Sequence, residues 1–365
     1  MMSIWVRKVY IMDKSKMFNS FSIELLNRLG KSDGNIVFSP LSIFAVLCMA
    51  AAGASGETRQ EIMDAMGSRL TAEELISLSE FLKESDDAVS TANALCVRYD
   101  AADSMKGDYL KLIRERFDAE LFASHDLVYD VNRWVNDKTD NMIPEILDES
   151  AADTLCSLIN ATTFMNAWCD PYDDYDVSKH SFHNISGSIS EVDMLFGSER
   201  NYIENRHVRG FMKPYKNERY AFMALLPKRK GEEALRKAIA NIDFSEVFEE
   251  CTWEEVHTCM PEFEYKCDKE LSGMLADMGM KKMFGTDADF SDMSTTDLFV
   301  DQVIHNAYIK VDRYGTKAAA ATIMYAVGSI PPEDYKTVTL DRPFIYAIMD
   351  VEKNVPVFTG VVREL

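Results

Sequence analysis

The chain contains 365 residues, of which 47% are hydrophobic, and its formal net charge is −21 at pH 7. This composition is typical of a globular protein with a large core and disfavours disorder. The negative charge disfavours nucleic acid as a partner, because phosphate binding requires clustered Lys and Arg. No apolar run reaches the roughly 18 residues of a transmembrane helix, so no membrane partner is expected.

The first part of the chain predicts mainly helices. Four apolar residues between 18 and 29 recur at helical spacing, and Gly30 follows them as a C-cap residue would. The next helices are predicted at 42–52, from 58 onward, at 71–83, at 109–117 and at 131–139. The helix from residue 58 is expected to begin with a capping box, because Glu61 follows Thr58 by three residues.

Strand patterns dominate from residue 155 onward. The segments expected to form strands are 155–165, 181–227, 309–311 and 344–349, with helices between them at 232–239 and 268–278. No repeat and no Pro/Gly/Ser-rich linker divides the chain. We therefore expect one α+β domain at 17–365, preceded by an N-terminal extension at 1–16.

The N-terminus and the cysteines bear on the compartment. Residues 1–16 lack the apolar core and cleavage site of a secretory signal, which predicts a cytoplasmic protein or one exported without a recognisable signal peptide. Seven cysteines without CxxC spacing argue against a disulfide framework and a zinc site, so most are expected to be buried free thiols. The glycosylation sequons at Asn160 and Asn184 are interpreted as chance matches.

No pattern in the chain indicates an enzyme or a cofactor. The six histidines show no metal-ligand spacing, and no Ser-His-Asp, Walker or Rossmann pattern occurs. We therefore expect no catalytic residues, no metal and no cofactor.

Residues 315–322 read Gly-Thr-Lys-Ala-Ala-Ala-Ala-Thr and lie between two predicted strands. Alanine favours helices and is depleted in strands, so a solvated loop or a short helix is one interpretation. The other is a segment that changes partners, being first a loop and later a strand within a sheet.

Short motifs along nearly the whole chain support the second interpretation. They are NIVFSPLSI at 35–43, GASGET at 53–58, NATTFMNAW at 160–168, MKPY at 212–215, LP at 226–227, PEF at 261–263, LADMGM at 275–280, HNA at 305–307, DRPF at 341–344 and FTG at 358–360. Together they resemble the serpins, the serine-protease-inhibitor family.

The resemblance implies a fold and a mechanism. The expected fold is a single serpin-like α+β domain with a large, mostly antiparallel main sheet, two smaller sheets, eight to nine helices and an exposed reactive-centre loop at about 313–332. The implied activity is that of a single-use suicide substrate for a serine endopeptidase. After cleavage of the loop, 316–327 inserts into the main sheet and the protease remains covalently trapped.

The resemblance assigns a hinge at the start of this loop. Its residues are Gly315, Thr316, Lys317, Ala318, Ala319, Ala320, Ala321 and Thr322. Alternate residues from Thr316 onward would face the core after insertion, and none of them is charged. The family usually has Glu at the positions of Arg313 and Lys317, so initial hinge contacts should differ while insertion is retained.

The bait bond is placed at Ser329–Ile330, with Gly328–Ser329 as the alternative and cleavage after Val327 as a third. The residues that lead to it, Tyr325, Ala326, Val327 and Gly328, are uncharged and mostly small. They favour an elastase-like or subtilisin-like target with a shallow pocket. Papain-like cysteine proteases are an alternative target, and a non-inhibitory carrier, chaperone or storage protein is an alternative function.

Two further sites follow from the resemblance. Ser39, Ser42, Asn160 and His305 match the polar cluster called the shutter, which gates insertion. Trp168 matches the breach, where the loop first enters, and an ordinary core tryptophan is the less favoured alternative. The helix at 71–83 has Lys83 as its only basic residue, so no heparin site is evident there. We expect a monomer that can polymerise by loop exchange.

Overall fold

The computed structural model describes residues 4–67, 71–83, 87–148, 154–316 and 335–365. It divides into two compact units. The first comprises Met1–Val37, Phe164–Tyr265 and Ile309–Leu365, and the second comprises Phe38–Thr163 and Lys266–Tyr308. Nine α-helices and 17 strands occur among the described residues, in the predicted α+β class. Three strands begin in one unit and end in the other: β4 (Cys156–Phe164), β12 (Phe263–Glu270) and β13 (Gln302–Asp312).

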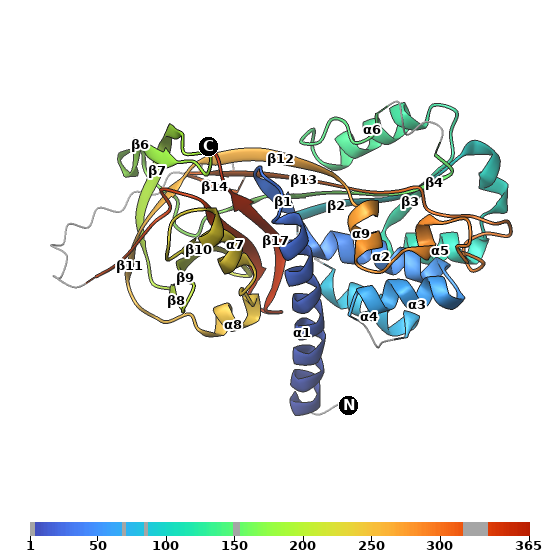
Figure 1. The fold of residues 1–365 in the computed structure, drawn as a ribbon, viewed down its shortest axis with the longest axis horizontal. Coiled ribbons are helices and arrows are strands. Elements are labelled where there is room, and N and C mark those ends of the chain that lie inside the picture. Colours follow the sequence, from blue (N-terminus) through green and yellow to red (C-terminus); the bar gives the residue numbers. More distant parts are fainter. Residues whose placement is uncertain (1–3, 68–70, 84–86, 149–153, 317–334) are drawn as a thin grey trace. The chain divides into compact units, whose positions relative to one another are not determined.

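The second unit contains most of the helices. They are α2 (Pro40–Gly53), α3 (Gly56–Ala65), α4 (Ala72–Leu82), α5 (Gly107–Phe117), α6 (Leu127–Lys138) and α9 (Ser272–Asp277). Figure 1 shows α2 to α5 on one side of the strands of this unit and α6 on the other. Nearly all of α2 is buried, which explains why its sequence is apolar on every side.

Helix starts show where local signals were sufficient. At α4, Glu74 donates its backbone N–H to the Thr71 hydroxyl and its carboxylate accepts the Thr71 N–H, so a capping box forms. The capping box predicted at Thr58 is wrong. The Thr58 hydroxyl instead accepts the backbone N–H of Asp289 at 2.9 Å, and the Glu61 carboxylate accepts that of Lys282 at 2.7 Å.

The strands of the second unit follow the order β3-β2-β4-β13, with β2 at Val89–Val97 and β3 at Ala119–Phe122. The β2–β3 and β4–β13 pairs are both parallel. The helix predicted at 268–278 is wrong in its first residues, because β12 continues to Glu270 and α9 begins at Ser272. Buried Phe263 and Cys267 lie on one face of β12, a strand pattern that extends past the predicted start.

The first unit is built around a six-stranded sheet in which four consecutive strand pairs are antiparallel. Its order is β1 (Ile36–Phe38), β17 (Val355–Val362), β16 (Phe344–Asp350), β10 (Tyr220–Pro227), β9 (Val208–Pro214) and β8 (Tyr202–Glu204). Every residue of β10, β16 and β17 is buried. A Cβ at Gly360 would lie 2.2 Å from the Ile36 carbonyl oxygen, so only glycine fits between β17 and β1.

A four-stranded sheet completes the first unit. Its order is β15 (Lys336–Thr339), β11 (Val256–Pro261), β7 (Ile189–Glu199) and β6 (Val177–His183). Two short strands, β5 (Asn166–Ala167) and β14 (Gly315–Thr316), pair beside the end of β13. The helices are α1 (Ile4–Leu29), α7 (Glu232–Ile239), which has the predicted bounds, and α8 (Phe244–Glu249). α1 begins well before the predicted helix, within the proposed N-terminal extension.

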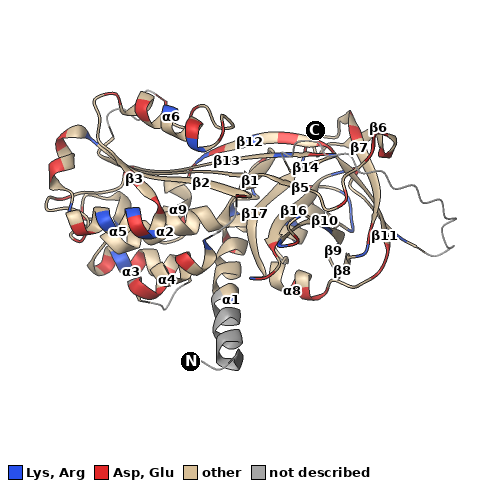
Figure 2. Ribbon diagram, turned by 180° about the vertical axis from the view of Figure 1, so that it is seen from behind, with Lys and Arg blue, Asp and Glu red and all other residues tan. Residues whose placement is uncertain are grey.

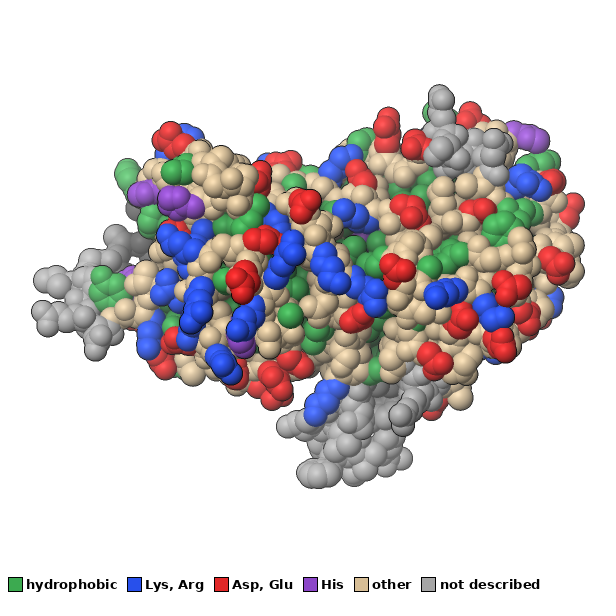
Figure 3. All heavy atoms as spheres, viewed as in Figure 1, with side chains coloured by type: hydrophobic (Ala, Val, Ile, Leu, Met, Phe, Trp, Pro, Cys, Tyr) green, Lys and Arg blue, Asp and Glu red, His purple; other side chains and the backbone are tan. Residues whose placement is uncertain are grey.

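Charge is distributed unevenly over the described residues. Acidic side chains recur along α3, α4 and α8 (Figure 2), whereas Lys and Arg gather over the region of β9, β10 and α7 (Figure 3). A surface depression there is lined by basic side chains, namely Arg206, His207, Lys228, Arg229 and Lys237. No helix among the described residues is long and apolar enough to cross a membrane.

The cysteines are free, and most are buried, as predicted. Cys48, Cys96, Cys156, Cys259 and Cys267 are buried, Cys251 is half-buried and Cys169 is exposed. Burial raises the pKa of the buried thiols Cys48 and Cys96 well above the usual value, which keeps them protonated and unreactive.

Candidate functional site

The hinge begins as a short strand in the first unit. After β13 the chain turns at Arg313 and Tyr314, and β14 then runs antiparallel to both β13 and β5. The Asp312 carboxylate closes this turn by accepting the backbone N–H of Tyr314 at 2.8 Å and that of Gly315 at 3.3 Å. The first two hinge residues therefore already form the middle strand of three.

Thr316, which was predicted to face inward, has no exposed surface. Its hydroxyl lies 2.6 Å from the hydroxyl of Tyr215, which is equally buried. The Tyr215 ring stacks on Trp168 with ring centroids 4.5 Å apart. The hinge threonine is thus buried beside two stacked aromatic rings in the first unit.

Trp168 binds the turn that leads into β14. Its indole Nε1–H donates to the Asp312 carbonyl oxygen at 2.9 Å, and its backbone N–H donates to the Tyr314 carbonyl oxygen at 2.9 Å. Trp168 is therefore a buried residue that binds the turn before the hinge, and its role in the breach stays a prediction.

A buried ion pair lies beside the stacked rings of Trp168 and Tyr215. The Lys213 ammonium is 2.8 Å from the Glu199 carboxylate and 4.4 Å from the centre of the Tyr172 ring. Burial opposes the charge of Lys213, but Tyr172 and Glu199 outweigh that effect and hold the pKa of Lys213 above its ordinary value. Sequence reasoning missed this pair, because its members come from β9 and β7.

Arg313 stands where the family usually has Glu, and its side chain binds two carboxylates. Its side-chain Nε and its backbone N–H both donate to Glu262 Oε1 at 3.0 Å. A second nitrogen, Nη1, donates to Asp174 at 3.0 Å. The expected change in hinge contacts is therefore a cation at the turn that is matched by two carboxylates.

Three of the four residues assigned to the shutter form one hydrogen-bonded chain in the second unit. His305 Nδ1 lies 2.7 Å from Asn160 Oδ1, and the Ser39 backbone N–H donates to His305 Nε2 at 3.1 Å. Asn160 and His305 are direct partners in the β4–β13 register. Ser42 joins through its backbone N–H, which donates to the Ser39 hydroxyl.

Asn93 of β2 extends this chain and was missed from sequence. Its Oδ1 accepts the Asn160 side-chain N–H at 2.8 Å, and its own amide donates to the Phe117 carbonyl oxygen. The one amide in β2, whose other residues are small or apolar, was the available signal. With it, the shutter network spans β2, β4, β13 and the N-terminus of α2.

The shutter network is electrically neutral. Since His305 Nε2 accepts a hydrogen bond from Ser39, the ring proton lies on Nδ1 and is donated to Asn160. Burial lowers the pKa of His305 to about 3, so the ring is uncharged at neutral pH. Separating β4 from β13 would break the Asn160–His305 bond at the middle of their register.

The remaining loop residues lie outside the described residues. These are hinge residues Lys317 to Thr322, specificity residues Tyr325 to Gly328, and the bait-bond residues Ser329 and Ile330. The chain is described again from Tyr335, and β15 then pairs with β11.

The three sheets, the hinge strand at the end of β13 and the polar network beneath the β4–β13 pair define an α+β protein of the serpin class. The profile of the serpin (serine protease inhibitor) family matches residues 16–365. The chain belongs to the serpin family, whose members are generally protease inhibitors rather than catalysts.

Similar proteins come from distant organisms. An uncharacterized serpin-like protein of Methanosarcina acetivorans is 30% identical, with 94% of this chain and 86% of the relative aligned. Leukocyte elastase inhibitor A of Mus musculus is 27% identical, with 93% of this chain and 96% of the relative aligned.

Solved structures of a thermophilic serpin, tengpin, are also similar. The native state is 30% identical with a TM-score of 0.88, and 96% of this chain and 94% of that one are covered. The latent state has a TM-score of 0.80 at 28% identity, with 96% of this chain and 97% of that one covered. The fold is thus more similar to the native than to the latent state.

Proposed function

We propose that this protein inhibits a serine endopeptidase by acting once as its substrate. The protease serine attacks the carbonyl of the bait bond, Ser329–Ile330 or Gly328–Ser329, and forms an acyl-enzyme with release of the new amino terminus. The loop segment 316–327 then inserts between β4 and β13 before water can hydrolyse the ester. The protease remains attached to the end of the inserted strand.

One observation carries this proposal: β14 already lies between β13 and β5. The hinge enters the sheet antiparallel to both neighbours, so the following residues can extend the same strand along β13. Between residues 317 and 327, Lys317 is the single charged residue and proline is absent. No buried charge or proline therefore opposes a buried strand, since Lys317 is expected on the outward face.

The parallel β4–β13 pair indicates where the free energy would come from. Insertion of an antiparallel strand replaces one parallel ladder with two antiparallel ladders, which are slightly more stable per residue. If each added backbone hydrogen bond contributes about 1 kcal/mol, a strand of this length stabilises the protein by on the order of 10 kcal/mol. This gain can support distortion of an attached protease.

The residues before the bait bond favour the class of target. Tyr325, Ala326, Val327 and Gly328 carry no charge, and a protease with a deep acidic pocket would gain little from them. The similarity to leukocyte elastase inhibitor A agrees with the elastase-like alternative.

Incubation with neutrophil elastase and with subtilisin tests the proposal. The expected result is a band at the summed mass that survives boiling in SDS, together with a released C-terminal peptide whose mass identifies the bait bond. Papain in a parallel reaction tests the cysteine-protease alternative. Loop cleavage by every protease without any complex would contradict inhibition and favour a carrier, chaperone or storage role.

A further inference from the structure

The basic depression of the first unit is formed by the turn that joins β8 to β9, the residues after β10 and the first two turns of α7 (Figure 3). Its volume is about 350 Å³, and its described lining consists of Arg206, His207, Lys228, Arg229, Ala234 and Lys237. This lining contains no carboxylate, although the net charge of the chain is −21. Neither the hinge nor the shutter network uses these residues, so the depression requires a separate explanation.

Backbone hydrogen bonds hold together the two loops that carry most of the basic residues. Asn205 caps the β8–β9 turn, because its Oδ1 accepts the backbone N–H of His207 at 2.9 Å and that of Val208 at 3.0 Å. The backbone N–H of Lys228 donates to the His207 carbonyl oxygen at 2.9 Å, just beyond the last pair of the β9–β10 ladder. The two loops are therefore already ordered, and a ligand between them has little backbone entropy to offset.

Helix α7 forms the third side of the depression. Leu235, Ala238 and Ile239 are buried, so α7 packs on the unit through this face. Ala234 and Lys237 are three residues apart and are therefore neighbours on another part of the helix surface. Because the Ala234 side chain is a single methyl group, it leaves the depression open beside the ammonium group of Lys237.

Most of the positive charge in the depression is not matched by a carboxylate. Lys228 is paired, since its Nζ is 2.7 Å from Glu204 Oε1. Within the ranges that the structure describes, Arg206, Arg229 and Lys237 form no ion pair. Like charges that gather without counter-charges repel one another and create a positive potential over the depression. A bound anion would relieve this repulsion.

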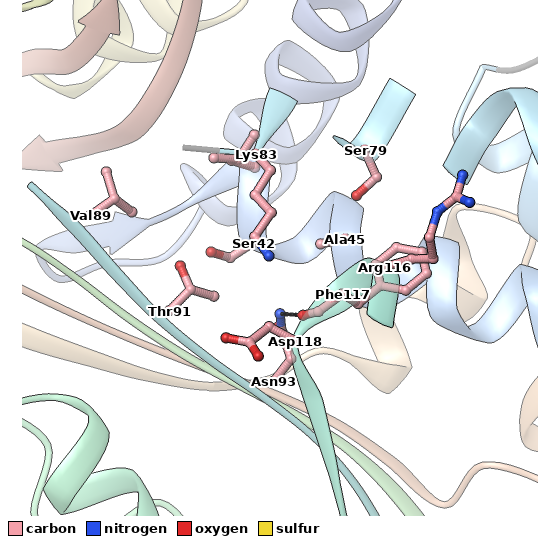
Figure 4. A pocket seen from close by; sticks show the side chains of 11 residues that line it. Ser42, Ala45, Ser79, Lys83, Val89, Thr91, Asn93, Arg116, Phe117 and Asp118 are labelled. Carbon is pink, nitrogen blue, oxygen red and sulfur yellow. Dashed lines mark hydrogen bonds between the residues drawn. The ribbon is translucent and has the colours of Figure 1, made fainter. Parts of the chain in front are cut away.

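The pocket of the second unit shown in Figure 4 has a different lining. It includes Lys83 and Asp118, one charge of each sign, and Arg116, whose guanidinium binds Glu80 at 3.0 Å. Charges of both signs give that pocket no preference for an anion. The basic depression carries charge of one sign and therefore selects for anions.

The residue types and the size of the depression indicate phosphate groups. A guanidinium presents parallel N–H groups that match two oxygens of one phosphate, whereas an ammonium adds a point charge. An apolar cavity of about 150 Å³ in another protein holds benzene, so about 350 Å³ suits on the order of a dozen non-hydrogen atoms. A chain of two or three phosphates has this size. Ala234 is the only apolar residue in the described lining, so little of it could hold an organic group.

We propose that the basic depression binds a compact ligand with two or three adjacent phosphate groups, either an inorganic oligophosphate or the phosphate end of a nucleotide. Arg206 and Arg229 bind the phosphates from the two loops, and Lys237 adds its charge from α7. Lys228 remains paired with Glu204 at the edge of the site.

Binding to the full chain is measured by isothermal titration calorimetry at neutral pH and low salt. Tripolyphosphate is expected to bind more tightly than pyrophosphate, and pyrophosphate more tightly than orthophosphate. Equal affinity for ATP and tripolyphosphate would assign the site to the phosphate end of a nucleotide, and weaker binding of ATP would assign it to an inorganic oligophosphate. Absence of binding by both, or orthophosphate binding as tightly as tripolyphosphate, would overturn the proposal.

A pair of charge-matched variants tests the location. Arg229→Gln should weaken tripolyphosphate about ten-fold, because a charge-assisted contact is lost. Lys281→Gln is the matched control, since it removes the same charge from an exposed lysine of the second unit, and its affinity should equal that of the wild type. Equal losses in the two variants would show general attraction by charge and refute a defined site.

Two substitutions of Ala234 separate charge from volume. Glu and Gln have similar size and similar helix propensity, so Ala234→Glu and Ala234→Gln should fill the depression equally and leave α7 intact. Only Ala234→Glu adds a negative charge, so it should abolish tripolyphosphate binding while Ala234→Gln retains weakened binding. Circular dichroism verifies that both variants are folded. Equal affinity of Ala234→Glu and wild type would place the ligand elsewhere and overturn the proposal.

Discussion

The turn before the hinge, in the first unit, and the shutter network, in the second unit, differ in the charge of the groups that hold them. Charged groups contribute to the turn before the hinge, where Arg313 binds Glu262 and Asp174 at partly exposed positions, in addition to the neutral contacts of Trp168. The shutter is held by neutral, buried groups that each have a fixed direction, Asn160 and His305 above all. At the hinge, β14 already pairs with β13 and β5, whereas at the shutter β4 and β13 pair directly with each other.

This difference shows what each region can tolerate. An exposed ion pair depends mainly on opposite sign, so its members can exchange places at small cost. A buried chain of amides and one imidazole depends on shape and on every donor having an acceptor, so no member can be removed cheaply. Substitutions at the Arg313 ion pairs should therefore change stability gradually, whereas loss of any member of the shutter network should disrupt the whole network.

The largest effect is expected from Thr316→Arg, which tests the inward face of the hinge. Thr316 is fully buried against Tyr215, and an unpaired charge there would cost several kcal/mol and block insertion. Titration against subtilisin should show a cleaved substrate in place of a covalent complex. Thr316→Ser is the matched control and should trap protease normally. A Thr316→Arg variant that traps protease at the wild-type stoichiometry would refute the assignment.

The next largest effect is expected on the stability of the shutter network. Asn160→Ala leaves the Nδ1–H of His305 and the Oδ1 of Asn93 without a hydrogen-bond partner, which should lower the free energy of unfolding by about 2–4 kcal/mol. Urea denaturation followed by circular dichroism measures this change. Asn136→Ala removes a half-buried amide on α6, which donates to Asn141 near the surface, and serves as the control. Equal midpoints for the two variants would show that the shutter network does not stabilise the native state.

Acid should loosen the shutter more than the hinge. The pKa of His305 is lowered to about 3 by burial, so the unfolded chain binds one more proton than the native state between that value and about 6.5. Stability is therefore lost as pH falls below about 6.5, by about 1.4 kcal/mol per pH unit from this group. The difference in unfolding free energy between wild type and His305→Asn, measured from pH 7.5 to 4.5, isolates the contribution. A difference that does not vary with pH would contradict a neutral buried imidazole.

The smallest effect is expected at the hinge ion pair. Arg313→Glu and Glu262→Arg should each lower stability by about 1 kcal/mol, and the double variant should recover part of the loss, because Asp174 would then face a like charge at position 313. A double-mutant cycle by thermal unfolding in low salt measures the coupling. Additive losses in the double variant would show that the pair contributes nothing, and that the hinge turn is held by Asp312 and Trp168 alone.

Local sequence signals predicted much of the secondary structure, but few of the hydrogen-bond partners in the site. The capping box of α4 and the bounds of α7 could be predicted, because their determinants lie within a few residues of one another. Thr58 and Glu61 satisfied the same local rule, yet they bind Asp289 and Lys282 more than 200 residues away. The strand β12 also continues past the predicted start of the helix at 268, because Cys267 is buried on the same face as Phe263.

The site shows the same division. Family motifs pointed to Ser39, Asn160, His305 and Trp168, which lie in the shutter network and beside the hinge. Asn93 and Tyr215 could not be predicted in the same way, since an isolated amide or tyrosine in an apolar strand carries no sign of its partner. Glu262 became recognisable as the partner of Arg313 only from the packing of the first unit.

Thermal unfolding before and after cleavage of the loop tests most directly whether β14 is the start of an inserting strand. Limited subtilisin digestion supplies the cleaved protein, and mass spectrometry verifies a single cut between residues 327 and 330. Insertion between β4 and β13 should raise the melting temperature by tens of degrees, from on the order of 10 kcal/mol of added stability. An unchanged melting temperature in the cleaved protein would contradict insertion.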